Sequence, residues 1–378
     1  MKKRFYTLCL TPDKVDLLKD PGMIPYYLGK MGYESHFVSF IEPRIEDPFQ
    51  EQVGGDITLH YLGKQKLPKH PQLMMCCRKA FRYIFTHRKE IDILNLYYLK
   101  HSILYGLFYK MVRPKGCLYI KVDMNVRAFE REATQPLHFV RRFVYQLYLR
   151  YVVDKVTIES TSGYKAFQEQ FALPPNKVLY LPNGIDDTYL DEVSPIPFEQ
   201  KEDLIITVAR IGAPEKNHEM LIEACKYIHW LGDWQLHLVG PVDEAFKERT
   251  LAAIKGMPWE DRIQFIGPIY DKKALFEYYS KSKIFCMTSR YESFGFVCIE
   301  AQAYGNILLS TPIAASPDFI PNEQIGHTIH SAIELADAIN YLIEHPESIE
   351  SACPYIISHA QQFRWSTVCA RLSDFLQS

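Results

Sequence analysis

The sequence lacks a long hydrophobic run and a secretory signal. Its 378 residues contain no apolar stretch of roughly 18, the length that a membrane-spanning helix requires. A basic start at Lys2-Lys3-Arg4 precedes an apolar run that ends at Thr11-Pro12-Asp13, which is too short for the hydrophobic part of a signal peptide. We therefore expect a cytoplasmic protein, either soluble or attached only to the inner face of the cytoplasmic membrane.

Residue patterns that bind metal ions are also lacking. The nine cysteines show no metal-ligand spacing, and the adjacent pair Cys76-Cys77 makes a poor zinc clamp. No acid-x-acid pair stands clearly at the end of a predicted strand, and the adjacent Asp186 and Asp187 suit the cap of a turn. We expect a protein without a metal ion or cofactor, in a reducing compartment.

Charge is divided unevenly along the chain. Residues 1–185 contain 28 Lys and Arg against 17 Asp and Glu, whereas the remainder contains 15 against 28. A basic half can be attracted to nucleic acid, to anionic lipid or to a phosphorylated substrate. The motifs include no nucleic-acid-binding module, so we expect no nucleic acid partner.

Both halves alternate short apolar strands with helical segments, the pattern of an open α/β sheet. Strands are predicted at 5–10, 35–40, 91–96, 117–122, 155–158 and 178–181, and then at 204–209, 235–240, 263–267 and 283–287. We predict two domains, 1–186 and 203–353, because the length is large for one core. An acidic, proline-interrupted linker at 187–202 would join them, and terminal helices would occupy 354–378.

Two glutamates form the most informative motif. Glu292 follows the predicted strand 283–287, and Glu300 lies two turns into the helical segment that Gly305 ends. Ser293 is a candidate N-cap, so the amides after it would be unpaired at the positive end of the helix and suited to a phosphate. A glutamate pair alone is more typical of a solvated helix; its position after a buried strand favours a ligand site.

Two cations stand at a similar place earlier in the chain. Arg210 follows the strand that ends at Ala209, and Lys216 precedes an amphipathic helix that Asn217 could cap. Open α/β sheets bind ligands at the carboxyl ends of their strands, and an arginine with a lysine suits a diphosphate. Each alone indicates a charged loop in solvent, whereas the combination with the glutamates favours phosphate binding.

Together these motifs resemble the nucleotide-sugar glycosyltransferases of family 4. The resemblance rests on Pro182-Asn183-Gly184-Ile185-Asp186, Arg210 with Lys216-Asn217, Gly240, Gly267, and Glu292-Ser293-Phe294-Gly295 with Glu300. It implies the GT-B fold, in which two Rossmann-like domains face each other across a cleft and a C-terminal helix crosses back to the N-terminal domain.

The resemblance also implies roles for single residues. Arg210 and Lys216 would bind the donor diphosphate, Glu300 would bind the ribose hydroxyls, and Glu292 would bind the transferred sugar. The expected catalytic residues are Glu292, Arg210, Lys216 and Asp123. The other residues expected to bind the donor are Ser293, Phe294, Gly295, Gly22, Asn183 and Tyr270, the last bordering the base.

The predicted roles of Gly22 and Asp123 fall where the sequence departs from the family pattern. The first loop, which holds Gly22, contains less glycine than is usual. Asp123 stands where many relatives have a histidine, so it would take over the sugar-binding or proton-accepting place or would cap a turn.

Basic and aromatic residues are interleaved at 78–89 and 139–150. Such helices can lie on an anionic bilayer. Helical spacing alone, however, predicts as core residues Phe139, Val140, Phe143, Val144, Leu147 and Tyr151. The charge division favours peripheral membrane contact and a lipid-diphosphate-linked glycan acceptor.

We expect a retaining hexosyltransferase that needs no metal. It would move a sugar from a nucleoside-diphosphate sugar, a UDP-sugar being preferred, to a glycan acceptor in cell-surface polysaccharide synthesis. Two alternatives stay open: a catalytically silent partner or scaffold of the same fold, and a sugar-nucleotide epimerase with a GT-B-like fold.

Overall fold

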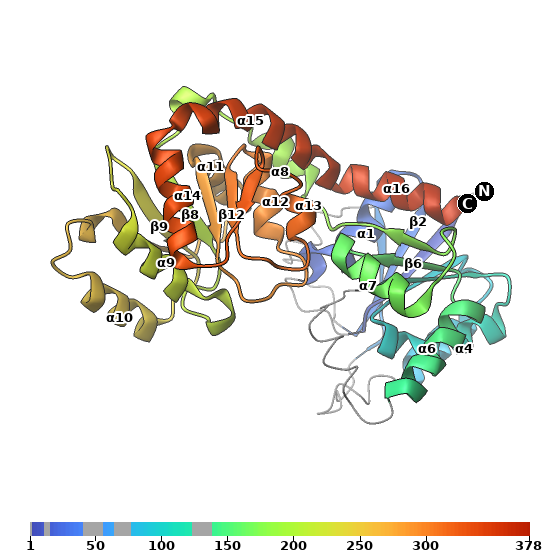
Figure 1. The fold of residues 1–378 in the computed structure, drawn as a ribbon. Helices are drawn as coiled ribbons and strands as arrows, with labels where there is room; N and C mark the ends of the chain where they lie inside the picture. The colour runs from blue at the N-terminus through green and yellow to red at the C-terminus, as the bar shows by residue number, and fades with distance from the viewer. Residues whose placement is uncertain (1, 11–15, 41–55, 64–76, 123–137) are drawn as a thin grey trace. The chain divides into compact units, whose positions relative to one another are not determined.

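The computed structural model describes residues 2–10, 16–40, 56–63, 77–122 and 138–378 (Figure 1). The chain forms two compact units. Unit 1 contains residues 1–184 together with 365–378, and unit 2 contains residues 185–364. Each unit is an α/β structure built on its own parallel sheet, which confirms the predicted fold class.

Unit 1 has a seven-stranded sheet in the order β3-β2-β1-β4-β5-β6-β7. Its strands are β1 (Arg4–Leu8), β2 (Glu34–Ser39), β3 (Ile57–Tyr61), β4 (Ile93–Tyr97), β5 (Cys117–Val122), β6 (Lys155–Ile158) and β7 (Val178–Tyr180). Its helices are α1 (Asp20–Lys30), α3 (Arg78–Thr86), α4 (Leu99–Val112), α6 (His138–Tyr151), α7 (Thr161–Phe171) and α16 (Trp365–Gln377), with a 3-10 turn at Asp16–Leu18.

Unit 2 has a six-stranded sheet in the order β10-β9-β8-β11-β12-β13. Its strands are β8 (Leu204–Val208), β9 (Gln235–Val239), β10 (Ile263–Gly267), β11 (Ile284–Met287), β12 (Ile307–Ser310) and β13 (Gly326–Thr328). Its helices are α8 (Asp187–Glu192), α9 (His218–Ala224), α10 (Glu244–Ile254), α11 (Lys272–Lys281), α12 (Phe296–Ala303), α13 (Ser316–Phe319), α14 (Ala332–Glu344) and α15 (Pro346–Ala360). Short 3-10 turns lie at Phe198–Gln200, Pro214–Lys216, Cys225–Tyr227, Glu260–Arg262 and Gln361–Phe363.

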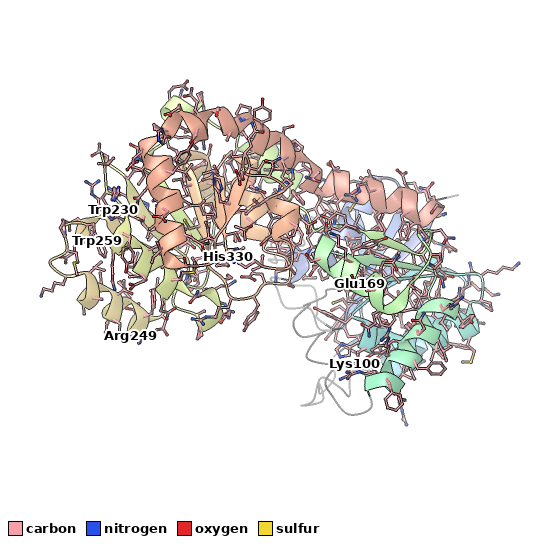
Figure 2. All side chains as sticks on the ribbon, in the orientation of Figure 1. Lys100, Glu169, Trp230, Arg249, Trp259 and His330 are labelled. Carbon is pink, nitrogen blue, oxygen red and sulfur yellow. The ribbon has the colours of Figure 1, made fainter. Side chains whose placement is uncertain are left out.

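Helices cover both faces of each sheet, and side chains fill the layers between them (Figure 2). In unit 2, one core includes Ile205 and Leu238, and a separate core includes Ile206 and Val239. Successive strand residues thus point to opposite faces, and both faces are apolar because both are covered. This is why the strands could be predicted from continuous apolar runs.

The domain boundaries differ from the predicted ones. The predicted linker 187–202 contains α8 and belongs to unit 2. Of the predicted terminal segment 354–378, the part up to residue 364 also stays with unit 2, and α16 alone joins unit 1. There α16 packs against α1, and the ring of Trp365 fills the space where a side chain on Gly184 would lie.

Two local predictions in unit 1 are wrong. Gly22, which was predicted to lie in the first loop, is in the first turn of α1, because Pro21 is well accepted at the start of a helix. The apolar positions predicted as core on α6 are exposed, with Phe139 and Tyr151 more than 70% accessible. The residues of α6 that are buried are Tyr148 and Leu149. Within the described ranges, none of the helices combines the length and apolar character that crossing a bilayer requires.

Candidate functional site

The candidate site lies at the carboxyl edge of the unit 2 sheet. The chain runs from β8 outward through β9 to β10, and then returns to the other side of β8 to form β11. Neighbouring strands whose crossovers lead in opposite directions leave a crevice at their carboxyl ends, where ligands bind in open α/β folds. Residues 209–217 follow β8 and residues 288–295 follow β11, so the two predicted motifs meet at this point of the sheet.

Lys216 and Glu292 contact each other directly. The ammonium group of Lys216 donates to Oε1 of Glu292, and the hydroxyl of Ser289 donates to the same oxygen at 2.9 Å. Both charged side chains are about four-fifths buried, with 19% and 21% of their surface accessible. The predicted proximity of a cation and an acid from two distant loops is therefore present in the structure.

The two loops are held together by further hydrogen bonds that the sequence did not indicate. The guanidinium of Arg290 donates to the carbonyl of Pro214 at 3.1 Å and to Oδ1 of Asn217 at 2.6 Å. The amide of Arg290 donates to the carbonyl of Glu215 at 2.8 Å. Thr288 donates through its hydroxyl to the carbonyl of Lys216 at 3.0 Å. These bonds fix the backbone that carries Lys216 relative to the loop that carries Glu292.

Arg210 is placed differently from the other three charged residues. Its guanidinium pairs with Glu215 five residues later, and 72% of its side chain is accessible to solvent. Arg210 therefore reaches into solvent, whereas Lys216 and Glu292 are largely buried. The arginine end of this pair is open to water, which screens the attraction, so Arg210 can exchange Glu215 for another anion at modest cost.

Glu300 occupies a more buried place on α12. Its carboxylate accepts a hydrogen bond from the ammonium of Lys272 at 2.8 Å and one from the hydroxyl of Tyr279 at 3.1 Å. Burial, with the nearby charge of Glu300, raises the pKa of Tyr279 well above its ordinary value, so the phenol stays protonated and donates a hydrogen bond to the carboxylate. Lys272 and Tyr279 come from α11, and no sequence motif marked either of them.

The start of α12 differs from the prediction. Gly295 and not Ser293 holds the N-cap position, with a φ of 102° that favours glycine. Phe294 is buried and packs edge-on against Phe319 and Phe296. The first amides of any helix have no partner within the helix, so the backbone from Phe296 onward still presents donors at the positive end of α12.

Asn217 also has a different role from the predicted one. It stands at the N-cap position of α9 in a left-handed conformation, with φ at 52°, and its side chain faces Met220 and Arg290 instead of capping the helix. The next residue, His218, accepts a hydrogen bond from the amide of Gly212 at 3.2 Å through Nδ1. Burial, together with the charge of Lys216, lowers the pKa of His218 to about 4, so its imidazole is neutral at pH 7.

Tyr270 lies in the loop between β10 and α11. Its side chain is 86% accessible, and Lys272, two residues later, contacts Glu300. The loop that carries Tyr270 is thus adjacent to the buried glutamate. This placement is compatible with the predicted contact to a base, which stays a prediction.

The remaining predicted residues belong to unit 1. Asn183 is buried, and its amide donates to Glu159 at 2.7 Å, which ties the loop after β7 to the end of β6. Gly22 is buried in the first turn of α1. Asp123 lies outside the described residues. Donor contacts from these three residues stay predictions.

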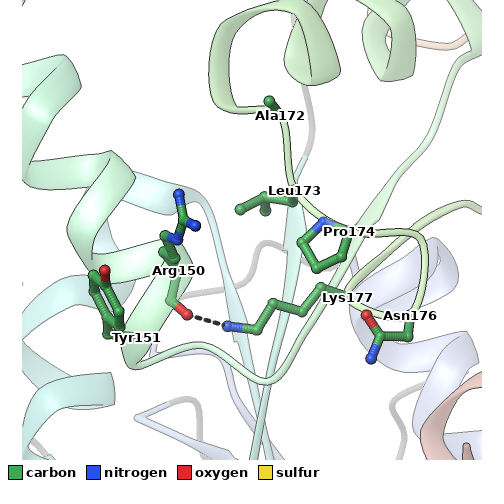
Figure 3. A pocket seen from close by; sticks show the side chains of 7 residues that line it. All are labelled: Arg150, Tyr151, Ala172, Leu173, Pro174, Asn176 and Lys177. Carbon is green, nitrogen blue, oxygen red and sulfur yellow. Dashed lines mark hydrogen bonds between the residues drawn. The ribbon is translucent and has the colours of Figure 1, made fainter.

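A cavity of about 510 Å³ in unit 1 is a poor candidate for the active site. It lies between the end of α6 and the loop before β7, and Figure 3 shows Arg150, Tyr151 and Lys177 on its wall. This loop leads into the start of β7, so the cavity is at the amino edge of the sheet, opposite the edge that binds ligands in such folds. Lys177 donates to the carbonyls of Leu149 and Arg150 that end the helix, which gives it a structural role.

Comparison with known proteins gives matches for the region that contains the site. Residues 191–357 match the model of glycosyl transferases group 1. Mannosylfructose-phosphate synthase of Agrobacterium fabrum is 24% identical over 310 residues, which cover 74% of this chain and 67% of that protein. The amylovoran biosynthesis glycosyltransferase AmsD of Erwinia amylovora is 35% identical over 107 residues, 28% of each chain.

Solved structures resemble the chain over its whole length. Anabaena Alr3699/HepE in complex with UDP has a TM-score of 0.71 and 17% identity, with both chains fully covered. The lipopolysaccharide outer core galactosyltransferase WaaB has a TM-score of 0.69 and 12% identity, covering 100% of this chain and 99% of that one. Identities this low concern the fold alone, and the predicted GT-B fold is confirmed. The family match and the structural neighbours support a glycosyltransferase of this fold.

Proposed function

We propose that this chain transfers a sugar from a nucleoside-diphosphate sugar to a hydroxyl group of a glycan, with the donor bound at the carboxyl edge of the unit 2 sheet. The observation that carries the proposal is the pair Lys216–Glu292, joined from two loops at the switch point of a sheet whose region matches group 1 glycosyl transferases. A UDP-sugar is the preferred donor, because HepE, a structural neighbour, is described in complex with UDP and with UDP-glucose.

Sugar transfer from this donor requires the site to stabilise a leaving diphosphate. The bond between the anomeric carbon and the diphosphate oxygen breaks, the diphosphate keeps the electron pair, and the acceptor hydroxyl forms the new bond and releases its proton. Lys216 and the helix start after Gly295 place positive charge where the diphosphate charge develops. Arg210 adds a second cation once the diphosphate replaces Glu215 as its partner.

The two glutamates would have separate tasks. Glu292 is held by Lys216 and Ser289 and would bind hydroxyls of the transferred sugar, whereas Glu300 would accept hydrogen bonds from the ribose. We assign no covalent role to Glu292, because in the family that these motifs resemble the corresponding glutamate contacts sugar hydroxyls. Membership of family 4 and retention of configuration are part of the proposal and rest on the resemblance of these motifs.

Metal independence is a further part of the proposal. Two cationic side chains and a helix start supply the positive charge that a divalent ion would otherwise bring. We expect sugar transfer to be unchanged after treatment with EDTA. Activity that disappears with EDTA and returns with added magnesium would contradict this part alone.

The acceptor is proposed to be a lipid-diphosphate-linked glycan in cell-surface polysaccharide synthesis, with the chain resting on the membrane. The excess of basic residues in the first 185 supports an anionic partner of this kind. A purified sample incubated with lipid-linked and with free glycans would show which of them receives the sugar.

The central test is release of the nucleoside diphosphate from a panel of nucleotide sugars by the purified chain. Lys216→Met should lower kcat/KM by about a hundredfold to a thousandfold, the loss expected when one preorganised donor to a developing charge is removed. Lys226→Met is the matched control, since Lys226 forms an exposed pair with Glu223 and should leave kcat/KM unchanged.

Other outcomes identify the alternatives. Release from none of the nucleotide sugars by the folded wild-type chain would refute the proposal and favour the silent scaffold. A changed sugar nucleotide formed without any acceptor would identify an epimerase instead.

A further inference from the structure

Helices α4 and α6 of unit 1 carry an exposed apolar surface. On α6 the exposed apolar residues are Phe139, Val140, Phe143, Val144, Leu147 and Tyr151, which recur every three or four positions along one face. On α4, Leu104, Leu107 and Met111 are exposed with similar spacing. We call these nine residues the α4–α6 surface. Exposed apolar helix faces of this kind mark an interaction site.

The two helices lie next to each other on one face of the sheet, as Figure 1 shows. The hydroxyl of Tyr148 on α6 donates to the carbonyl of Ser102 on α4 at 2.9 Å. A side chain at Gly106 of α4 would meet that same hydroxyl. The contact uses the buried edge of α6, so the exposed apolar face of α6 is a second face with no role in holding the helix to unit 1.

The exposed charged side chains on these two helices are all basic, whereas Lys110, which is less exposed, pairs with Asp154 just beyond the end of α6. Helices α4 and α6 contain five basic residues and no aspartate or glutamate. Arg142 donates to the carbonyl of Gln170 at 3.0 Å, so this contact does not neutralise its charge. Arg150 is exposed at the end of α6, and Lys100, labelled in Figure 2, is exposed at the start of α4.

We propose that the α4–α6 surface is the place where the chain docks on an anionic lipid bilayer, with the aromatic and aliphatic side chains inserted between the headgroups. Apolar residues on one helix face with arginines beside them are the composition of helices that lie in a membrane interface. The inference rests on the proposed function in one respect, since a lipid-linked acceptor is the reason for the membrane contact.

A second copy of the chain fits this surface less well. A symmetric dimer would bring the exposed basic side chains Lys100, Arg142 and Arg150 against their own copies, and the two helices offer no carboxylate to pair with them. A bilayer containing phosphatidylglycerol supplies apolar chains and negative charge together. The positive charge of the surface therefore favours an anionic bilayer over a second copy of the chain.

The direction of α6 relates the docking surface to the ligand-binding edge of the unit 1 sheet. Helix α6 follows β5 in the chain, so it begins toward the carboxyl edge of the unit 1 sheet and runs back toward the amino edge. Phe139, Val140 and Phe143 are consequently at the end nearer the edge where open α/β sheets bind ligands. A lipid-linked glycan could then keep its lipid in the bilayer while its sugar reaches that edge.

The test is flotation of the purified full chain, without nucleotide, on phosphatidylcholine vesicles with and without phosphatidylglycerol. We expect binding to the vesicles that contain phosphatidylglycerol. Phe139→Ser with Phe143→Ser should weaken it roughly a hundredfold, the loss expected for two phenyl rings that leave the bilayer. The matched control is Ile333→Ser with Tyr341→Ser, two similarly exposed residues of α14 in unit 2, which should bind as wild type does.

Charge is tested by Arg142→Gln with Arg150→Gln. Each arginine near an anionic surface contributes about 1 kcal/mol, so this variant should bind roughly thirtyfold more weakly, and the difference should disappear at high salt. All substituted side chains are exposed, so the variants should fold.

Three results would overturn the inference: no binding to either kind of vesicle, equal binding by the phenylalanine variant and wild type, or a solution dimer that the phenylalanine substitutions dissociate. Release of nucleoside diphosphate from a soluble donor, measured on the same samples, keeps the two proposals apart. Vesicle binding without release of nucleoside diphosphate would support the docking surface and contradict the proposed function. Release of nucleoside diphosphate without vesicle binding would support the proposed function and contradict the docking surface.

Discussion

Glu300→Gln should weaken nucleotide binding while leaving the fold intact. The substitution keeps the size of a side chain that is only 9% accessible, and it removes the negative charge that accepts from Lys272 and Tyr279. If the carboxylate also accepts from the ribose hydroxyls, each lost hydrogen bond to a charged group costs roughly 1.5 to 3 kcal/mol. We expect the Kd for UDP to rise about thirtyfold, which corresponds to about 2 kcal/mol.

The cost to folding should be smaller than the cost to binding. The ammonium of Lys272 is 38% accessible and can be hydrated when its partner loses charge, so the pair stabilises the fold by about 1 kcal/mol or less. A slightly lower Tm with an unchanged far-ultraviolet spectrum is therefore expected. Calorimetry with UDP measures the affinity, and Glu344→Gln, which removes an exposed acid, is the matched control.

A companion variant separates direct binding from positioning. Lys272→Met leaves the Glu300 carboxylate in place with Tyr279 as its remaining neighbour, so it should lose less affinity than Glu300→Gln does. A Kd for the folded Glu300→Gln protein within twofold of the wild-type value would refute the assignment of Glu300. A larger loss in Lys272→Met would show that the lysine, and not the glutamate, makes the contact.

Three further predictions concern stability and the base. Because the pKa of His218 is lowered to about 4, its contribution to the free energy of unfolding is complete above about pH 6.5 and is lost as the pH falls from there to 4, roughly 3 kcal/mol in all. In urea titrations, the free energy of unfolding of His218→Gln should change less with pH over that range than the wild-type value does. An equal change with pH in both proteins would contradict the assignment. Gly240→Ala should destabilise unit 2 by at least about 3 kcal/mol in denaturant, since φ is 135° and a methyl carbon would lie 1.8 Å from the carbonyl oxygen of Ala209; wild-type stability would refute this. Tyr270→Ala should raise the Kd for UDP about fivefold if the ring stacks on the base, with equal affinity for ribose 5-phosphate as the control.

The sheets could be predicted from sequence because both faces of each strand are covered. Residues such as Ile205, Ile206 and Phe285 are all buried, so their strands read as unbroken apolar runs. The exposed face of α6 could not be predicted in the same way. Helical spacing shows that Phe139 and Phe143 share a face, but it does not show whether a neighbouring element covers that face.

Only part of the candidate site could be predicted from the sequence. The meeting of Lys216 and Glu292 followed from their positions after two strands, and strand order then brought the loops together. The pairing of Arg210 with Glu215 depends on side-chain conformation, which spacing does not specify. The contact of Lys272 with Glu300 joins the first residue of α11 to the middle of α12, and the sequence separation of these residues carries no signal for it.

The division of the chain places a constraint on the order of events during synthesis. The last piece of unit 1 is α16, and the ribosome makes it only after all 180 residues of unit 2, from 185 to 364, have been polymerised. Until then the face of α1 that α16 covers stays exposed, and the space beside Gly184 that Trp365 fills is vacant. Unit 2, whose residues are continuous, can reach its native state on the nascent chain, whereas unit 1 must wait in an incomplete form. Chains that stop before residue 365 should consequently be targets for chaperones and proteases even though most of both sheets has been made.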